Sequence, residues 1–136
     1  MTPSNGSENP VCVITGVGDT TGAALARRFA AGGYRVAMIA RDGERLIALE
    51  KEIPGSRAFP CDIGNLEALT TTVAKIQSSM GAPEVLVHNA VAHTFDTFLD
   101  ADPTDLERNF RVNTTALLYL TRELAPDMID AGKGAI

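Results

Sequence analysis

A glycine-rich segment near the N-terminus has the residue types of a phosphate-binding turn. It reads TGVGDTTG over residues 15–22 and begins at the last residue of the apolar run VCVIT. Glycine lets a backbone turn tightly and approach a ligand closely, and the amides that begin a following helix attract a pyrophosphate. The spacing is GxGxxxG, not the common GxGxxG, so alone the segment could also be a simple connection. Its place between a strand and a helix favours a dinucleotide site. The contacts that we expect here come from Gly16, Gly18, Thr20, Thr21 and Gly22.

A single arginine indicates which dinucleotide would bind. Arg41 follows the apolar run RVAMIA, about twenty residues after the turn, where an acidic residue binds the ribose hydroxyl of NAD and an arginine suits the 2′-phosphate of NADP. A solvated surface arginine is the alternative interpretation. We therefore expect NADP as the cofactor, with NAD less favoured. Asp42, the next residue, is better explained as a helix cap.

The hydrophobic pattern predicts strands that alternate with helices. Short β-rich runs at residues 11–15, 35–40, 57–61 and 84–88 fit strands. Helical spacing occurs at 23–31, at 43–52, in a segment capped by Asn65, and in a long segment capped by Asp102. We expect Pro126 to kink or end this last helix, and the final residues to begin another strand.

This alternation predicts an α/β fold, namely a Rossmann-like doubly wound parallel sheet of about four strands with a fifth just begun. Ligands of such sheets bind at the carboxyl ends of the strands, where the strand order reverses. The loops after the first and fourth strands are therefore the places where we expect the site.

Four segments, in order along the chain, resemble the N-terminal half of a short-chain dehydrogenase/reductase. TGVGDTTG is similar to the family's TGxxxGxG, with Thr20 in place of the middle glycine. PCDI has an aspartate after the third strand, HNAV is similar to the family's NNAG, and FRVNTTALL contains its VN pair. The resemblance covers residues 11–136 and implies an NAD(P)-dependent oxidoreductase that transfers a hydride to or from a carbonyl or alcohol substrate.

The resemblance also implies roles for individual residues. In the family, the aspartate that Asp62 matches contacts the adenine, and Ile63 packs beside it. Asn89 and Ala90 match the cofactor-binding NNAG segment. Asn113 matches an asparagine that supports a proton relay, and it is the one catalytic residue we assign.

The chain also departs from the family pattern. Thr20 brings a β-branched side chain, and Asp19 either places a negative charge beside an anionic ligand or caps the following helix. Val91 is expected to narrow the cleft, and His88 to be a hydrogen-bonded structural residue. The catalytic serine and the Tyr-x-x-x-Lys pair have no counterpart, because neither Tyr34 nor Tyr119 is followed by lysine four residues later.

We therefore expect residues 1–10 to be a disordered leader and residues 11–136 an incomplete dinucleotide-binding domain, truncated before the serine. An unpaired side of the strand at 84–88 and an exposed patch of Leu117, Leu120 and Leu124 would then promote self-association. Two functions remain open. One is an NADP-dependent oxidoreductase represented by its cofactor-binding half, and the other is a noncatalytic dinucleotide-binding or interaction module.

Composition limits the other function classes. The 136 residues carry a net charge of -5, which argues against nucleic acid or an anionic membrane as partner. The sequence contains no run of about 20 apolar residues, so we expect no membrane span. We also expect no metal site. Cys12 and Cys61 both lie in apolar runs, so we expect buried reduced thiols and a cytoplasmic protein.

Overall fold

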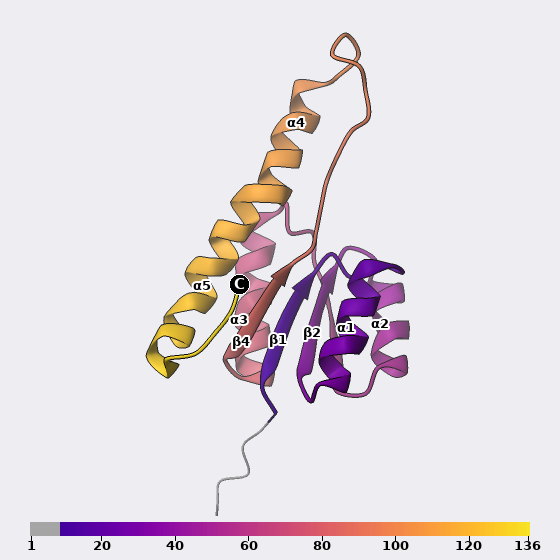
Figure 1. The fold of residues 1–136 in the computed structure, drawn as a ribbon. Coiled ribbons are helices and arrows are strands. Elements are labelled where there is room, and N and C mark those ends of the chain that lie inside the picture. Colours follow the sequence, from indigo (N-terminus) through magenta and orange to yellow (C-terminus); the bar gives the residue numbers. More distant parts are fainter. Residues whose placement is uncertain (1–8) are drawn as a thin grey trace, which may run out of the picture.

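The computed structural model describes residues 9–136, which form strands and helices in alternation (Figure 1). The elements are β1 (Val11–Thr15), α1 (Thr21–Ala31), β2 (Arg35–Ala40), α2 (Gly43–Glu52), β3 (Ser56–Pro60), α3 (Leu66–Met80), β4 (Pro83–His88), α4 (Pro103–Phe110), the π-helical turn η1 (Arg111–Thr115) and α5 (Ala116–Ala131). The predicted strands are confirmed, with β3 shifted one residue earlier in the chain and β4 beginning one residue earlier than expected. The last helical segment consists of three parts that follow one another without a break.

The strands form one parallel sheet in the order β3-β2-β1-β4. From β1 the chain proceeds to β2 and β3 on one side, and then crosses to β4 on the other side of β1. The strand order therefore reverses between β1 and β4, which is where a ligand is expected on a doubly wound sheet. This arrangement confirms the predicted fold class.

Helices cover both faces of the sheet (Figure 1). Cys12 and Ile14 of β1 pack with α1 and α2 on one face, whereas Val11 and Val13 pack with α3 and α5 on the other. Successive side chains of a strand point to opposite faces, so a strand covered on both faces must be apolar throughout. This explains why VCVIT shows no polar alternation.

The long C-terminal helical segment corrects the expectation that Pro126 could end it. Pro126 neither ends α5, which continues to Ala131, nor separates it from the core, because Leu124 and Met128 on either side are buried. Leu106 and Phe110 of α4 are 70% and 63% exposed. The π-helical turn η1 joins α4 to α5, and α4 extends beyond the ends of the strands, so its side chains have no face of the sheet to cover (Figure 1).

The predicted exposed leucine patch is wrong. Leu120 and Leu124 are fully buried and Leu117 is partly buried. The face of α5 that carries these leucines packs against α3 and the sheet. The outer side of β4 is also partly paired. Leu86 N donates to Ala135 O at 2.9 Å, and Ala135 N donates to Glu84 O at 3.0 Å. The C-terminal residues thus extend the sheet at one position, in agreement with the expected start of a fifth strand.

The predicted disordered leader lies mostly outside the described residues. Its last two residues are described, and both accept hydrogen bonds from Arg35: Pro10 O from the backbone amide at 2.9 Å and Asn9 O from the side chain at 3.0 Å. Within residues 9–136, no helix combines the length and apolar character that crossing a membrane requires.

Candidate dinucleotide-binding site

The turn after β1 packs closely against the loop after β4. Gly16 has φ 71°, and a Cβ atom there would lie 2.5 Å from Ala90 Cα. A Cβ atom on Gly22 would lie 2.5 Å from Gly16 O, whereas one on Gly18 would meet no atom within 4 Å. Gly16 and Gly22 are therefore required for packing, and Gly18 faces open space.

Thr20 does not require the backbone freedom of glycine. Its φ is -102°, and no non-glycine residue in the described part of the chain has a positive φ. Thr20 is the N-cap residue of α1, without a side-chain capping bond. Asp19 does not cap this helix. Its carboxylate instead forms an ion pair with Arg45 of α2.

Two hydrogen bonds tie the end of β1 to the end of β4. Asn89 Nδ2 donates to Gly16 O at 3.0 Å, and Ala90 N donates to Thr15 Oγ1 at 3.2 Å. Asn89 therefore holds the glycine turn by its backbone. The first backbone amides of a helix have no hydrogen-bond partner within the helix. Here the glycine turn places the first amides of α1 between β1 and β4, where the strand order of the sheet reverses.

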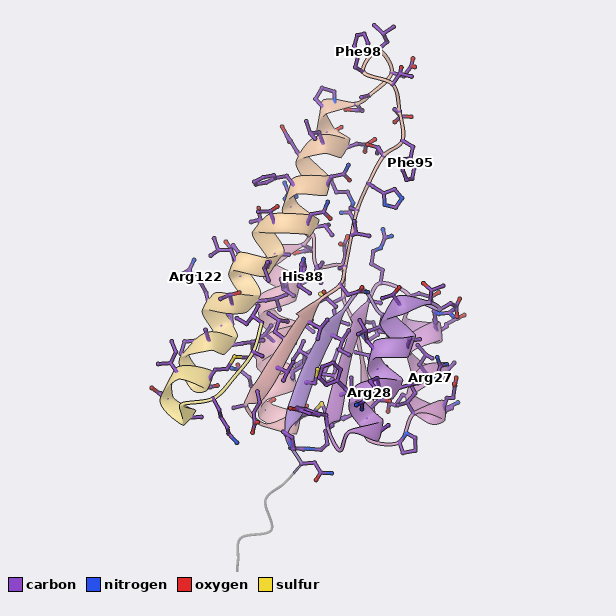
Figure 2. The ribbon with its side chains drawn as sticks, viewed as in Figure 1. Arg27, Arg28, His88, Phe95, Phe98 and Arg122 are labelled. Carbon is purple, nitrogen blue, oxygen red and sulfur yellow. The ribbon has the colours of Figure 1, made fainter. Side chains whose placement is uncertain are left out.

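His88 connects the same two strands to the long helix (Figure 2). Its Nε2 lies 3.1 Å from Val112 O, and its Nδ1 lies 3.1 Å from Thr15 Oγ1. A carbonyl only accepts, so Nε2 carries the proton, and in the neutral ring Nδ1 accepts from the Thr15 hydroxyl. Burial lowers the pKa of His88 below its ordinary 6.5, outweighing the opposing effect of the backbone carbonyl. The structure thus makes His88 a hydrogen-bonded structural residue, as expected.

Asp62 follows β3 and is held by both backbone and side-chain donors. Its Oδ1 accepts from Gly64 N at 2.9 Å, and Arg108 Nη2 of α4 lies 3.2 and 3.3 Å from its two oxygens. Burial raises the pKa of Asp62, but the bonds from Arg108 and Gly64 outweigh it, so the pKa lies below its usual value. Ile63, beside it, is buried.

Two arginines lie at the junction of β2 and α2. Arg41 is exposed at the end of β2, and Arg45 lies in the first turn of α2. Asp42 caps this helix, since its side chain accepts from Arg45 N at 3.0 Å. This confirms the interpretation of Asp42 as a cap.

The Asn113 side chain fixes the loop that follows β4. Its Nδ2 donates to Ala92 O at 2.9 Å, and its Oδ1 accepts from Ala92 N at 2.8 Å. The amide therefore bonds both polar groups of one backbone residue. Figure 2 shows how far this loop continues, with Phe95 and Phe98 extending well away from the sheet.

These elements surround a cavity of about 930 Å³ at the carboxyl ends of the strands. This is within the size range of small-molecule and cofactor sites, which extends to about 1,000 Å³. Arg45 and Arg108 line the cavity as well. The structure brings together all ten residues expected to bind a dinucleotide: Gly16, Gly18, Thr20, Thr21, Gly22, Arg41, Asp62, Ile63, Asn89 and Ala90. Asn113 lies outside this lining set.

Comparison with known proteins identifies the family. The model of the short chain dehydrogenase family matches residues 10–136. The chain belongs to this family. A D-xylose 1-dehydrogenase from Caulobacter vibrioides is 35% identical over 91% of this chain and 50% of its own length.

Solved structures of short-chain dehydrogenases share the fold. A metagenomic short-chain oxidoreductase in complex with NADP superposes with a TM-score of 0.85 at 33% identity, over 92% of this chain and 58% of that one. A 3-ketoacyl-(acyl-carrier-protein) reductase from Brucella melitensis complexed with NADH gives 0.83 at 29% identity, over 93% and 54%. The chain spans about half the length of the curated relatives it matches.

Among the residues that line the cavity, the sequence analysis missed two arginines, Arg45 and Arg108. Arg45 is four residues from Arg41 and lies in the first turn of α2, so its closeness in the chain to Arg41 could have suggested that both face the site. Arg108 is 46 residues from Asp62 and has no local signal that links the two. In the described residues, no group of three or more potential ligand side chains is placed to hold a metal ion.

Proposed function

We propose that this chain is the NADP-binding half of an oxidoreductase that transfers a hydride to or from a carbonyl or alcohol substrate. The observation that carries the proposal is the convergence of the glycine turn, Arg41 and Asp62 on one cavity. One related structure is a complex with NADP and another is a complex with NADH, so similarity to known structures does not decide which cofactor this chain binds. Arg41 at the end of β2 favours NADP.

The residues present fit a dinucleotide. The amides that begin α1 suit the pyrophosphate, with Gly18 leaving room for it, and Arg41 suits the 2′-phosphate. Asp62 and Ile63 would hold the adenine end, while Asn89 and Ala90 keep the turn in place. When bound, the nicotinamide ring supplies or accepts the hydride.

Asn113 is proposed to act in catalysis by positioning the loop after β4. Its side-chain amide makes two hydrogen bonds to Ala92, one through Nδ2 and one through Oδ1, so the contribution that the structure supports is to hold that backbone. The same observation favours the second candidate function, a noncatalytic dinucleotide-binding module. Reading the coding sequence beyond residue 136 would distinguish the two, because the oxidoreductase requires a Tyr-x-x-x-Lys pair downstream in the same reading frame.

A cytoplasmic location is also proposed. Cys12 and Cys61 are both free and buried. Burial raises the pKa of Cys12 to about 12, so its unreactive thiol form persists. Buried reduced thiols are typical of proteins from a reducing compartment.

Binding of NADPH and NADH to the purified protein, followed by fluorescence titration, tests the cofactor. We expect NADPH to bind about 10- to 100-fold more tightly than NADH, because a charge-assisted contact with the 2′-phosphate contributes about 1.5–3 kcal/mol. The variant Arg41→Ala should lose most of this preference. The control Arg28→Ala removes an exposed arginine of α1 that does not line the cavity, and should keep it. Equal affinities that Arg41→Ala leaves unchanged would refute the choice of NADP.

A further inference from the structure

His88 contacts three walls of the proposed nucleotide site without lining the cavity itself. Its Nδ1 accepts from the Thr15 hydroxyl and its Nε2 donates to Val112 O, each over 3.1 Å. Thr15 Oγ1 in turn accepts from Ala90 N at 3.2 Å. Gly16, the residue after Thr15, lines the cavity together with Ala90 and Val112, but His88 does not. The contacts that link His88 to a ligand therefore run through these walls.

The direction of each hydrogen bond in this chain of contacts depends on a neutral His88. Because a carbonyl only accepts, Nε2 carries the proton of the neutral ring, and Nδ1 is left to accept. A second proton would make Nδ1 a donor toward Thr15 Oγ1. The Thr15 hydroxyl would then lose its acceptor, and solvent water cannot replace it, since Thr15 is fully buried. The bond to Val112 O, in contrast, is the same in both states of the ring.

The surroundings of His88 favour its neutral form. Its two bonded partners are a hydroxyl and a carbonyl, and neither carries a charge that would stabilise an imidazolium. Burial lowers its pKa, and backbone groups of Val112 and Asn113 oppose this only in part. The ionisable side chains nearest in the chain to these contacts, on each packed element, are exposed Arg111 (η1), exposed Arg122 and partly buried Tyr119 (α5), exposed His93 (the loop after β4), Glu84 of β4, which pairs with Lys133, and Cys12 of β1, on the opposite face of the sheet.

The wall that His88 holds through Thr15 is the one that fixes the glycine turn. Ala90 packs against Gly16 so closely that a Cβ atom there would lie 2.5 Å from Ala90 Cα. The amides that begin α1 follow this turn, and they are the groups proposed to bind the pyrophosphate. A change in the bond between Thr15 and Ala90 therefore reaches the phosphate-binding amides through the Ala90–Gly16 contact.

On the basis of the nucleotide site proposed above, we propose that His88 is a positioning residue that couples nucleotide binding to the loss of a proton. The neutral ring holds the turn, through Thr15 and Ala90, in the arrangement that binds the pyrophosphate. Binding to the protonated protein therefore releases the proton of Nδ1 to the buffer. Because the pKa of His88 lies below its ordinary 6.5, affinity is complete above that pH and decreases as the pH falls through the lowered pKa.

Calorimetric titration with NAD between about pH 5 and about pH 7.5 tests this proposal without any need for turnover. NAD is the probe because its pyrophosphate does not titrate in this range, whereas the 2′-phosphate of NADP loses a proton at about pH 6. We expect the dissociation constant to rise about two- to tenfold toward the acidic end, which corresponds to the loss of one hydrogen bond. Titrations in two buffers of different ionisation enthalpy count the protons. We expect release of a fraction of a proton at the acidic end and none at the neutral end.

Three variants locate the effect on the path from His88 to Ala90. His88→Asn removes the titrating ring and should abolish both the pH dependence of the affinity and the proton release. Thr15→Val removes the oxygen that links His88 to Ala90, and should abolish both although His88 is still present. Thr15→Ser keeps this oxygen and should retain both. A purely structural role of His88 would lower the affinity in His88→Asn without changing the proton count.

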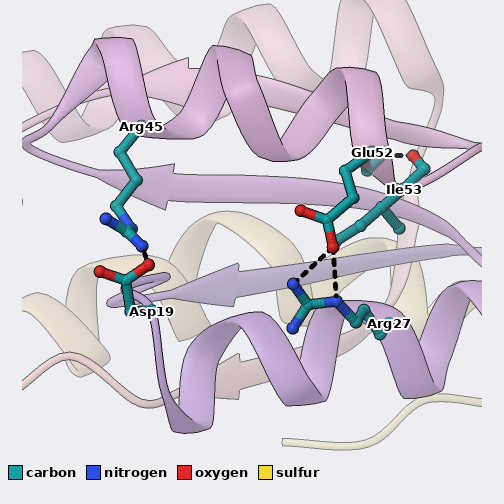
Figure 3. A network of polar contacts seen from close by, with 6 residues as sticks. Asp19, Arg27, Arg45, Glu52 and Ile53 are labelled. Atoms are coloured by element: carbon teal, nitrogen blue, oxygen red, sulfur yellow. Dashed lines mark hydrogen bonds and ion pairs between the residues drawn. The ribbon is translucent and has the colours of Figure 1, made fainter.

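Two further variants are matched controls. His93→Asn removes an exposed histidine of the loop after β4. Arg27 of α1 donates to Glu52 Oε1 of α2 through Nε at 3.1 Å and Nη2 at 2.6 Å, and neither residue lines the cavity (Figure 3). Arg27→Gln therefore removes one positive charge away from the site, the same change in net charge as the loss of the His88 proton. Both controls should keep the pH dependence and the proton release of the wild type.

The outcomes separate this inference from the nucleotide site on which it rests. An affinity for NAD that does not change with pH, or that changes equally in His88→Asn, overturns the role of His88 while the nucleotide site stands. An affinity that rises toward acidic pH also overturns it, because the imidazolium would then attract the pyrophosphate instead of releasing the turn. Thermal melts at each pH show which variants are folded, and Thr15→Val serves for the comparison where His88→Asn is not. Failure of the wild-type protein to bind NAD at any of these pH values would refute the nucleotide site itself, and this inference with it.

Discussion

Gly16 and Gly18 are two residues apart in the same turn, but the structure requires glycine at only one of them. Gly16 has φ 71° and lies against the backbone of Ala90, whereas a Cβ atom on Gly18 would meet nothing within 4 Å. The spacing of the two glycines predicted that both belong to a turn. Spacing does not show which atoms pack against each position. The partner of Gly16 is 74 positions later in the chain, so the difference between the glycines was not predictable.

Gly16→Ala should therefore destabilise the protein while Gly18→Ala is tolerated. An alanine at position 16 costs roughly 1–3 kcal/mol for its backbone conformation, and the contact with Ala90 adds to this. At position 18 we expect a change within about 0.5 kcal/mol. Urea unfolding of the two variants measures both values. Equal stability of the two variants would contradict the packing of the turn against the β4 loop.

The helix caps show what the sequence predicts well at the scale of single elements. Asp42, Asn65 and Asp102 were each predicted to begin a helix, and each side chain accepts a backbone amide two or three residues later. A cap is a local contact between near neighbours, so it is visible in the sequence. The π-helical turn η1 and the Arg108–Asp62 contact depend on how distant elements pack, and neither was predicted.

His88 joins three elements, and its ionisation should make their association depend on pH. Because burial lowers its pKa below 6.5, the folded protein binds fewer protons than the unfolded chain just below that pH. The stability contribution of neutral His88 is therefore complete above pH 6.5 and is lost as the pH falls through the window down to its lowered pKa. We expect the free energy of unfolding to decrease over this window.

Urea unfolding between about pH 5 and pH 7.5 measures this effect, with two matched variants. His88→Asn removes the titrating group and should flatten the dependence over the window. His93→Asn removes an exposed histidine of the loop after β4 and should leave the pH dependence of the unfolding free energy unchanged. A slope that persists in His88→Asn would show that another group is responsible.

At the scale of the whole molecule, the site is a consequence of parallel strands. All four carboxyl ends meet at one edge of the sheet, so residues from four separate loops converge there. The sequence predicted this convergence, because alternating strands and helices with right-handed crossovers allow few other arrangements. The outer side of β4 was less predictable. Its pairing with Ala135 and the burial of Leu120 and Leu124 depend on where α5 comes to rest.

A dinucleotide in this cavity would connect the two sides of the sheet, since the cavity is lined from the end of β3 to the end of β4. At one hundred times its dissociation constant, NADP should stabilise the folded chain by about 2.7 kcal/mol and raise its melting temperature by roughly 10 °C. Inorganic pyrophosphate at the same concentration controls for a general effect of anions.

Hydrogen exchange then shows where the stabilisation acts. We expect slower exchange both at the amides after β3, near Ile63 and Gly64, and at those after β4, near Ala90 and Ala92, because both loops line the cavity or lie against it. The amides of the far end of α2, near Glu52, do not line the cavity and serve as the internal reference. Protection confined to one side of the sheet, or a melting temperature that pyrophosphate raises equally, would mean that the ligand does not span the cavity as a dinucleotide must.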